Sequence, residues 1–138
     1  MRSFLPALLF ASASAAPANA AQPIEGLWRN PIGSAIIRVA PCGNVLCGAV
    51  VWASARGRAE VAKNTSHVVG TTVLTGVKRT APNPWTGRPY VPDDNIHVSA
   101  RLELESYGSL KLTGCGLVGL ICRTQIWTRT DEPLPPND

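Results

Sequence analysis

The stretch LKLTGCGLVGLICRTQIWTR, Leu110–Arg129, decides how the rest of the chain is interpreted. Glycines in its middle separate two strand-like runs, a pattern typical of a β-hairpin. A cysteine lies near each side of the turn, and a tryptophan and an arginine lie near the end. The last strand of a small barrel pairs with the first, because an open edge leaves backbone N–H and C=O groups unpaired. We therefore interpret this stretch as the hairpin that closes a barrel.

Short runs rich in β-branched and aromatic residues precede this hairpin, and they are separated by turn-forming residues. Together with the hairpin they predict about eight strands and almost no helix, the pattern of an all-β antiparallel barrel or sandwich. Alternation is clearest in the last run, where apolar residues occupy every second position and predict one buried face. The runs are Gly26–Arg29, Ser34–Ala40, Leu46–Trp52, Val68–Thr80, Trp85–Val91 and Ile96–Glu105. The alternating apolar residues are Ile96, Val98, Ala100, Leu102 and Leu104.

The segment Ala53–His67 interrupts the strand pattern. It is compatible with one helical turn near Arg58–Ala62 or with a polar loop. Binding groups tend to lie in loops at the mouth of a barrel. The segment is therefore a candidate contact region in either form.

The first residues, MRSFLPALLFASASAAPANA, have a basic start, an apolar centre and a small-residue end. This pattern predicts a secretory signal peptide over residues 1–20, with cleavage after Ala20. We expect residues 21–130 to form a single barrel domain and residues 131–138, DEPLPPND, to form a disordered, acidic, proline-rich tail. No later stretch is long enough to predict a transmembrane segment. The expected location is periplasmic or secreted.

The chain has four cysteines, an even number that favours two disulfides in an exported protein. Three pairings are possible in principle. We favour Cys42–Cys47 and Cys115–Cys122, because each pair straddles a predicted turn. A zinc site is the alternative, but the spacings C-x4-C and C-x6-C are unfavourable for zinc. We expect no metal and no other cofactor.

Composition and motifs argue against nucleic-acid binding and catalysis. The formal charge is only +4, and the cations are scattered rather than clustered with stacking aromatics. His67 and His97 are the only side chains that could act as bases near neutral pH. Ser66 precedes His67, but no nucleophile elbow surrounds the pair. Asp93 and Asp94 fit turn chemistry better than a calcium site. We therefore expect a protein that is not an enzyme.

Five motifs occur in an order that resembles a bacterial exported family catalogued as domain-of-unknown-function family 2147. The most specific is the final GC…GLIC-x-x-Q-x-W-T-R block, and the likeness covers nearly all of the chain after the signal peptide. After the VPDD turn, this chain departs from the usual pattern with Asn95, Ile96 and His97. The motifs are Gly26-x-Trp28, PCGNVLCGAVVW (Pro41–Trp52), Val69-Gly70-Thr71, GR-x-Y-VPDD (Gly87–Asp94) and Leu110–Arg129.

The resemblance implies a calycin-like, lipocalin-type β-barrel in the bacterial envelope, and it implies no established activity. Barrels of this type place a late arginine over the tryptophan of a Gly-x-Trp entry. Trp28 and Arg129 match those positions in order and spacing. We expect them to form a structural latch, with a cation–π contact of about 0.5–2 kcal/mol.

Two functional hypotheses follow. The first is a non-catalytic barrel that binds a small apolar or amphipathic molecule, with Trp52, Trp85 and Tyr90 as the ligand-binding aromatics. The alternative is a filled barrel that acts as an envelope protein–protein interaction or inhibitor-like module. Its contact loops would be Ala53–His67 and Ala81–Trp85. An eight-stranded barrel has just enough room for side chains or one small ligand, so both hypotheses are physically open. The sequence makes no prediction of the oligomeric state.

Overall fold

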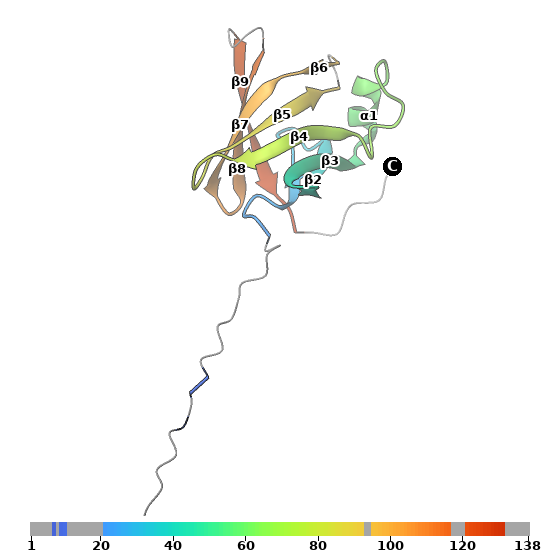
Figure 1. The fold of residues 1–138 in the computed structure, drawn as a ribbon. Helices are drawn as coiled ribbons and strands as arrows, with labels where there is room; N and C mark the ends of the chain where they lie inside the picture. Colours follow the sequence, from blue (N-terminus) through green and yellow to red (C-terminus); the bar gives the residue numbers. More distant parts are fainter. Residues whose placement is uncertain (1–6, 8, 11–20, 93–94, 117–120, 132–138) are drawn as a thin grey trace, which may run out of the picture.

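The computed structural model describes residues 7, 9–10, 21–92, 95–116 and 121–131 (Figure 1). Apart from residues 7, 9, 10 and 131, the predicted signal peptide and tail lie outside the described residues, as do Asp93 and Asp94. The strands are β1 (Gly26–Arg29), β2 (Ala35–Cys42), β3 (Val45–Ala53), β4 (Thr72–Arg79), β5 (Trp85–Val91), β6 (Ile96–His97), β7 (Ser99–Ser106), β8 (Ser109–Gly116) and β9 (Ile121–Arg129). A short helix, α1 (Ala55–Val61), lies between β3 and β4.

The strands form one closed antiparallel barrel, so the predicted fold class is confirmed. The order is β4-β3-β2-β1-β9-β8-β7-β5, with β6 paired to β5, and the pairing of β4 with β5 completes the ring. The predicted closing hairpin is β8 and β9, which pair from Ser109↔Thr128 to Gly116↔Ile121. The last strand then meets the first through Trp28↔Arg129 and Arg29↔Thr128.

Large apolar side chains pack inside the barrel from every principal strand. The most deeply buried members of this core are each no more than 1% exposed: Ile24, Trp28, Val39, Ala53, Leu74, Val77, Trp85, Leu102 and Leu110. Two glycines on inward-facing positions show how tightly this interior is packed. A Cβ added at Gly48 would lie 3.0 Å from side-chain atoms of both Ile37 and Leu74. A Cβ added at Gly87 would lie 2.9 Å from Val77 Cγ2 and 3.3 Å from Leu74 Cδ1. At these positions neighbouring side chains already occupy the interior.

The substitution Gly87→Ala tests this packing. We expect it to lower the free energy of unfolding by about 1–3 kcal/mol, because inserting a methyl group into a filled core forces neighbours off their preferred rotamers. Gly108→Ala is the matched control, since a Cβ there meets nothing within 4 Å and the backbone is not left-handed. Urea denaturation compares the two variants with the wild type. Unchanged stability of Gly87→Ala would mean that the interior beside β5 has room to spare.

The run Ile96–Glu105 is not one strand, and this part of the sequence prediction is wrong. The chain forms β6 and β7 on either side of Val98, whose N–H donates to the Pro89 carbonyl. Ala100 and Leu102 are buried as predicted, but Ile96 is 46% exposed. Ile96 lies at the end of the pairing with β5, directly after the turn residue Asn95, which has a φ of 53°. The register against β5 is the same on both sides of Val98, from Val91↔Ile96 to Trp85↔Leu102, so the exposure of Ile96 reflects its place at the end of the pairing and not a change of side-chain direction.

The irregular segment after β3 contains a true helix rather than a single turn. Ser54 caps α1, with its hydroxyl oxygen accepting a hydrogen bond from the Gly57 N–H at 3.0 Å. Val61 anchors the other end of the helix, because it is 5% exposed and belongs to the barrel core. The helix therefore covers one end of the barrel, beside β3 and the start of β4 (Figure 1).

Candidate functional site

One end of the barrel is built around Arg129. Its guanidinium carbon lies 4.3 Å from the ring centroid of Trp28 and 4.3 Å from that of Tyr107, so two aromatic rings contact one cation. Its nitrogens also donate to three backbone carbonyls, those of Tyr107 at 2.7 Å, Glu25 at 2.8 Å and Pro23 at 2.6 Å. The side chain thus joins β9, β1, the β7–β8 turn and the segment before β1. The strength of this predicted latch stays a prediction.

Sequence reasoning missed Tyr107 as the second ring. The available signal was the Ser106-Tyr107-Gly108 turn, which directly precedes the hairpin that carries Arg129. An exposed aromatic in a turn has no obvious partner in the sequence. Tyr107 is 72% exposed, and its ring lies over the outer side of the guanidinium group.

Trp85 lies at this same end of the barrel, so it does not line an open mouth. It is 1% exposed, and its indole N–H donates to Gln22 Oε1 at 2.9 Å. The Arg79 guanidinium carbon lies 4.8 Å from the centroid of the Trp85 ring. Two tryptophans, each beside an arginine, therefore close the end of the barrel that faces the segment before β1.

Tyr90 and Trp52 lie on the outer side of the barrel wall. Trp85, Gly87 and Pro89 mark the inward positions of β5, so Tyr90 faces outward. Its ring lies 5.0 Å from that of His97, and its hydroxyl donates to Asn95 Oδ1 at 2.7 Å.

Trp52 is paired with Ile36, which is 1% exposed but lies outside the core cluster on the outward face of β2. Cross-strand partners share one face of a sheet, so Trp52 also packs outside. The three aromatics predicted to bind a ligand therefore do not converge on one site.

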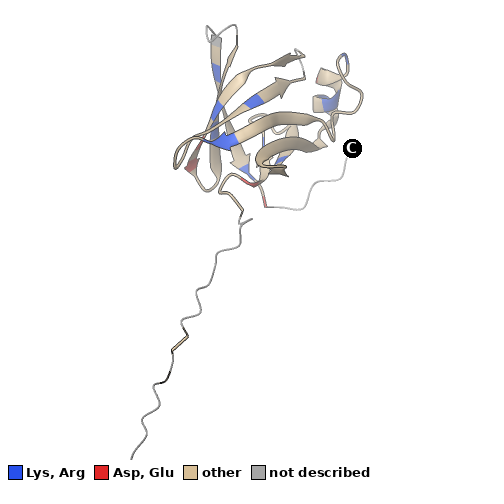
Figure 2. Ribbon diagram, viewed as in Figure 1, with Lys and Arg blue, Asp and Glu red and all other residues tan. Residues whose placement is uncertain are grey.

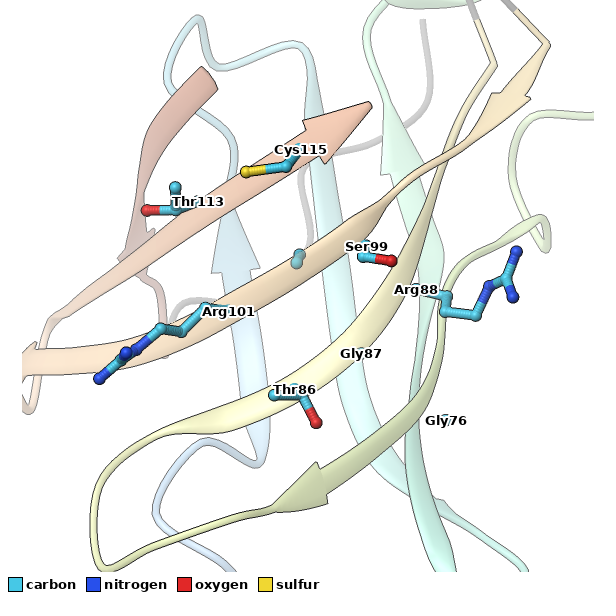
Figure 3. A pocket seen from close by; sticks show the side chains of 9 residues that line it. Gly76, Thr86, Gly87, Arg88, Ser99, Arg101, Thr113 and Cys115 are labelled. Carbon is cyan, nitrogen blue, oxygen red and sulfur yellow. The ribbon is translucent and has the colours of Figure 1, made fainter. Parts of the chain in front are cut away.

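A shallow groove of about 570 Å³ crosses the outer face of β4, β5, β7 and β8 (Figure 3). Hydroxyl groups from three strands line its floor, and Arg88 and Arg101 lie at its two sides. The arginines point away from each other, and Arg101 forms an ion pair with Glu103. The groove is therefore a polar surface without two converging cations. The hydroxyl residues are Thr86, Ser99 and Thr113.

A second hollow, of about 450 Å³, is lined by residues 79–82 where β4 turns into β5. This is part of the loop Ala81–Trp85 that the sequence marked as a contact region. The Arg79 guanidinium donates to the Pro82 carbonyl in this turn, so the hollow has a defined backbone shape. It lies at the same end of the barrel as the two tryptophans.

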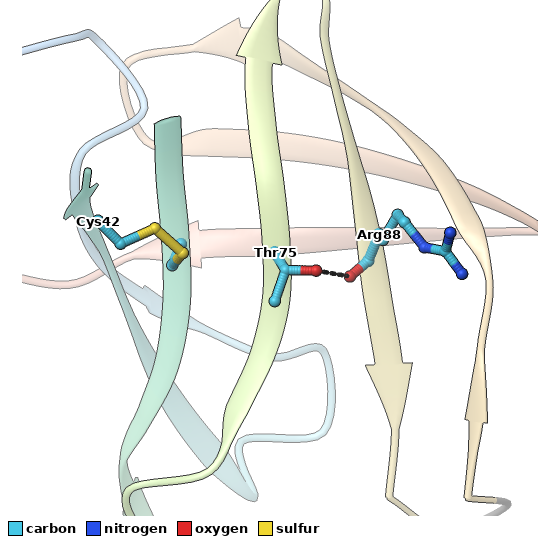
Figure 4. Close-up of a disulfide and its surroundings, with 4 residues drawn as sticks. Cys42, Thr75 and Arg88 are labelled. Carbon is cyan, nitrogen blue, oxygen red and sulfur yellow. Dashed lines mark hydrogen bonds between the residues drawn. A yellow bond between two sulfur atoms is a disulfide. The ribbon is translucent and has the colours of Figure 1, made fainter. Parts of the chain in front are cut away.

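Both disulfides join the cysteines that the sequence favoured. Cys42 and Cys47 span the β2–β3 turn with Cα atoms 5.8 Å apart, and Cys115 and Cys122 join β8 to β9 with Cα atoms 4.1 Å apart. Figure 4 shows the first beside β4, where the Thr75 hydroxyl donates to the Arg88 carbonyl at 3.4 Å. Paired cysteines are typical of an oxidising compartment and so of an exported protein.

The described part of the chain contains neither a cluster of metal-ligating side chains nor a membrane-spanning helix. No three side chains among its histidines, cysteines, aspartates and glutamates are grouped closely enough to hold a metal ion. Within the same residues, no helix has both the length and the apolar character needed to cross a membrane. The described residues thus offer surfaces and loops as candidate sites.

Comparison with known proteins places the chain in a family. A family model described as "Uncharacterized protein conserved in bacteria (DUF2147)" matches residues 26–129. No curated protein sequence matches significantly. The solved structure titled "Protein HP1028 from the human pathogen Helicobacter pylori belongs to the lipocalin family" is 13% identical with a TM-score of 0.59. That match covers 78% of this chain and 83% of the other, and identity this low shows likeness of fold alone. The chain belongs to the bacterial DUF2147 family and has a lipocalin-like fold.

Proposed function

We propose that the protein is an exported, non-catalytic binding module of the bacterial envelope that contacts another protein with its outer surface. One observation carries the proposal. The inward positions in the middle of the barrel are occupied by buried side chains, and even the inward glycines Gly48 and Gly87 contact their neighbours there. A ligand inside the barrel would have to displace core side chains, whereas a partner on the outside would displace only water.

The contact regions proposed for this role lie at the two ends of the barrel. One is the segment Ala53–His67, which carries α1 and exposes Arg56 and Glu60. The other is the turn Ala81–Trp85, beside the hollow at residues 79–82. Short loops on a rigid barrel are a common arrangement for binding, because the scaffold holds them in place.

A small amphipathic ligand is the second candidate, and one observation favours it. Gly114 and Gly116 lie on inward positions of β8, at the end away from Arg129. A Cβ at Gly116 would meet only Val98, at 3.6 Å, which is ordinary contact. This end of the barrel is therefore less tightly packed than its middle and would accept a small apolar group near its rim.

Affinity capture from envelope extracts separates the two candidates. The bait is the tagged mature chain with both disulfides intact, and native mass spectrometry of the same preparation detects bound small molecules. We expect one protein to be captured and then displaced by an excess of untagged protein. A stoichiometric small molecule without a displaceable protein would contradict the interaction module and support the second candidate.

A further inference from the structure

Strand β9 is longer than the strand that closes the barrel against it. It pairs with β8 along its whole length, but it pairs with β1 only at Thr128 and Arg129, because β1 ends at Arg29. We call residues Arg123–Trp127 the β9 edge. Among the described residues, no strand pairs with the β1-facing side of this edge. In Figure 1, β8 and β9 rise together beyond the rest of the barrel.

Exposure supports this description of the β9 edge. Side chains on a strand with one covered face alternate between buried and exposed. Here Arg123, Thr124, Gln125 and Ile126 are all exposed, so both faces of the strand meet solvent. Trp127, which is 8% exposed, marks the point where the barrel core begins. Residues 123–126 therefore extend beyond the packed core of the barrel.

The hydrogen bonds at the end of β9 show which backbone groups face the open side. The Arg129 N–H donates to Gly108 on the β8 side, whereas the Thr130 N–H donates to Leu27 on the β1 side. Alternate residues of an antiparallel strand direct their N–H and C=O groups to opposite neighbours. The same alternation, followed from Thr130 back along β9, directs the backbone N–H and C=O groups of Thr124 and Ile126 toward the open side. These groups form a ready template for an added strand.

Charge identifies the chemistry of the strand that would fit. The strands around the β9 edge, β1, β2, β8 and β9, contain five cations and no acidic residue. The acids on the barrel strands, Glu103 and Glu105, lie on β7, and Figure 2 shows the cations as short blue segments on several strands, β4 and β5 included. A second copy of this chain would bring like charges together, whereas an acidic segment would be attracted. The five cations are Arg29, Arg38, Lys111, Arg123 and Arg129.

We propose that the β9 edge binds an extended, acidic segment of a partner protein as an added β-strand. The main-chain groups of Thr124 and Ile126 supply the hydrogen bonds, and Arg123 attracts acidic side chains of the segment. This inference rests on the proposed function, adds the β9 edge to the two contact regions named there, and names the chemistry of the partner. The contact depends on ionic strength, because the charges involved are exposed.

Amide hydrogen exchange measured by NMR tests the proposal on the mature protein. The probe is a short synthetic peptide of alternating valine and glutamate, and a valine–lysine peptide is its control. We expect the glutamate peptide to slow exchange of the Thr124 and Ile126 amides by about tenfold or more, because both become hydrogen-bonded. The lysine peptide is expected to leave them unchanged. Equal protection by both peptides, or no protection at saturating peptide, would overturn the proposal.

Two variants locate the contact. Thr124→Pro removes an N–H that faces the open side of β9 and leaves the hydrogen bonds to β8 in place. An edge-strand position whose N–H faces solvent tolerates proline. Arg123→Glu keeps the backbone and reverses the charge, and Arg88→Glu makes the same charge change on β5 as the matched control. We expect the first two variants to lose peptide protection and Arg88→Glu to keep it. Retained binding by Arg123→Glu, with its fold verified by unchanged β8 amide exchange, would overturn the proposal.

The capture experiment distinguishes this inference from the proposed function. If Thr124→Pro no longer captures the envelope protein that the wild type captures, the result supports both the binding module and the β9 edge as its contact surface. If it captures that protein equally well, the binding module stands and the β9 edge is the wrong surface. A concentration-dependent dimer that Thr124→Pro abolishes would instead identify a second copy as the occupant and would overturn the acidic segment.

Discussion

Replacing Arg129 with alanine is expected to lower the free energy of unfolding by about 3 kcal/mol. The change removes contacts to two aromatic rings and leaves three backbone carbonyls without their charged donor. Gly26 contributes to this geometry, because a Cβ there would lie 2.7 Å from Arg129 Nη1 and its φ is +133°. Arg129→Lys is expected to recover part of the loss, since one ammonium cannot reach all three carbonyls.

Arg79→Ala is the matched control for this prediction. Arg79 also lies over a tryptophan, at 4.8 Å from the Trp85 ring, but it is exposed, and among the described residues its guanidinium donates to one backbone carbonyl, that of Pro82. We expect that substitution to cost about 1 kcal/mol or less. Denaturant unfolding with both disulfides intact measures the two variants side by side. Equal costs would show that Arg129 is an ordinary surface contact and not a latch.

Trp28→Ala is expected to have the largest effect, with a loss of about 4 kcal/mol in the free energy of unfolding. The side chain is 0% exposed, and its indole N–H donates to the Ile24 carbonyl at 2.9 Å. The substitution leaves a cavity, an unpaired carbonyl and an arginine without its stacking partner. Trp28→Phe is expected to lose about half as much, because it keeps most of the buried volume.

Trp52→Ala serves as the comparison for Trp28→Ala, because Trp52 is half-buried on the outer wall. We expect thermal and denaturant unfolding to show that the Trp28→Ala variant is much less stable than the Trp52→Ala variant. A double-mutant cycle between Trp28 and Arg129 then measures their coupling directly. Additive losses in that cycle would contradict the stacking arrangement.

Most of the fold could be predicted from local patterns. The glycine-spaced hairpin Leu110–Arg129 identified the closing strands, because a small barrel has to pair its last strand with its first. Each favoured disulfide crosses a turn of two neighbouring strands, so sequence spacing alone was informative. The pair Trp28 and Arg129, which the structure brings within 4.3 Å, was predicted from the resemblance to lipocalin-type barrels and not from a local pattern.

The positions of the three aromatics that were predicted to bind a ligand could not be located in this way. A tryptophan in a strand looks the same in the sequence whether it faces the core, the rim or the outer wall. Trp85 meets Gln22 across 63 residues of sequence, a contact that no local pattern encodes. Trp52 lies beyond a register shift between Ile36 and Ile37, and such a shift changes the face to which later side chains point.

The β9 edge was equally hidden in the sequence. It exists because β1 has 4 residues and β9 has 9, so the partner strand ends before β9 does. Strand boundaries are the least reliable part of any sequence prediction. The length difference between two strands is therefore visible only in three dimensions.

Fluorescence titration with an apolar dye that emits on entering a dry cavity tests the central claim, that the barrel is filled and binds on its outside. The comparison variant is Leu102→Ala, which empties a core position that is 0% exposed. We predict no saturable dye binding by the wild type and clear saturable binding by the variant. Saturable binding by the wild type, with a shift in tryptophan emission, would contradict the account and show that the barrel holds ligands inside.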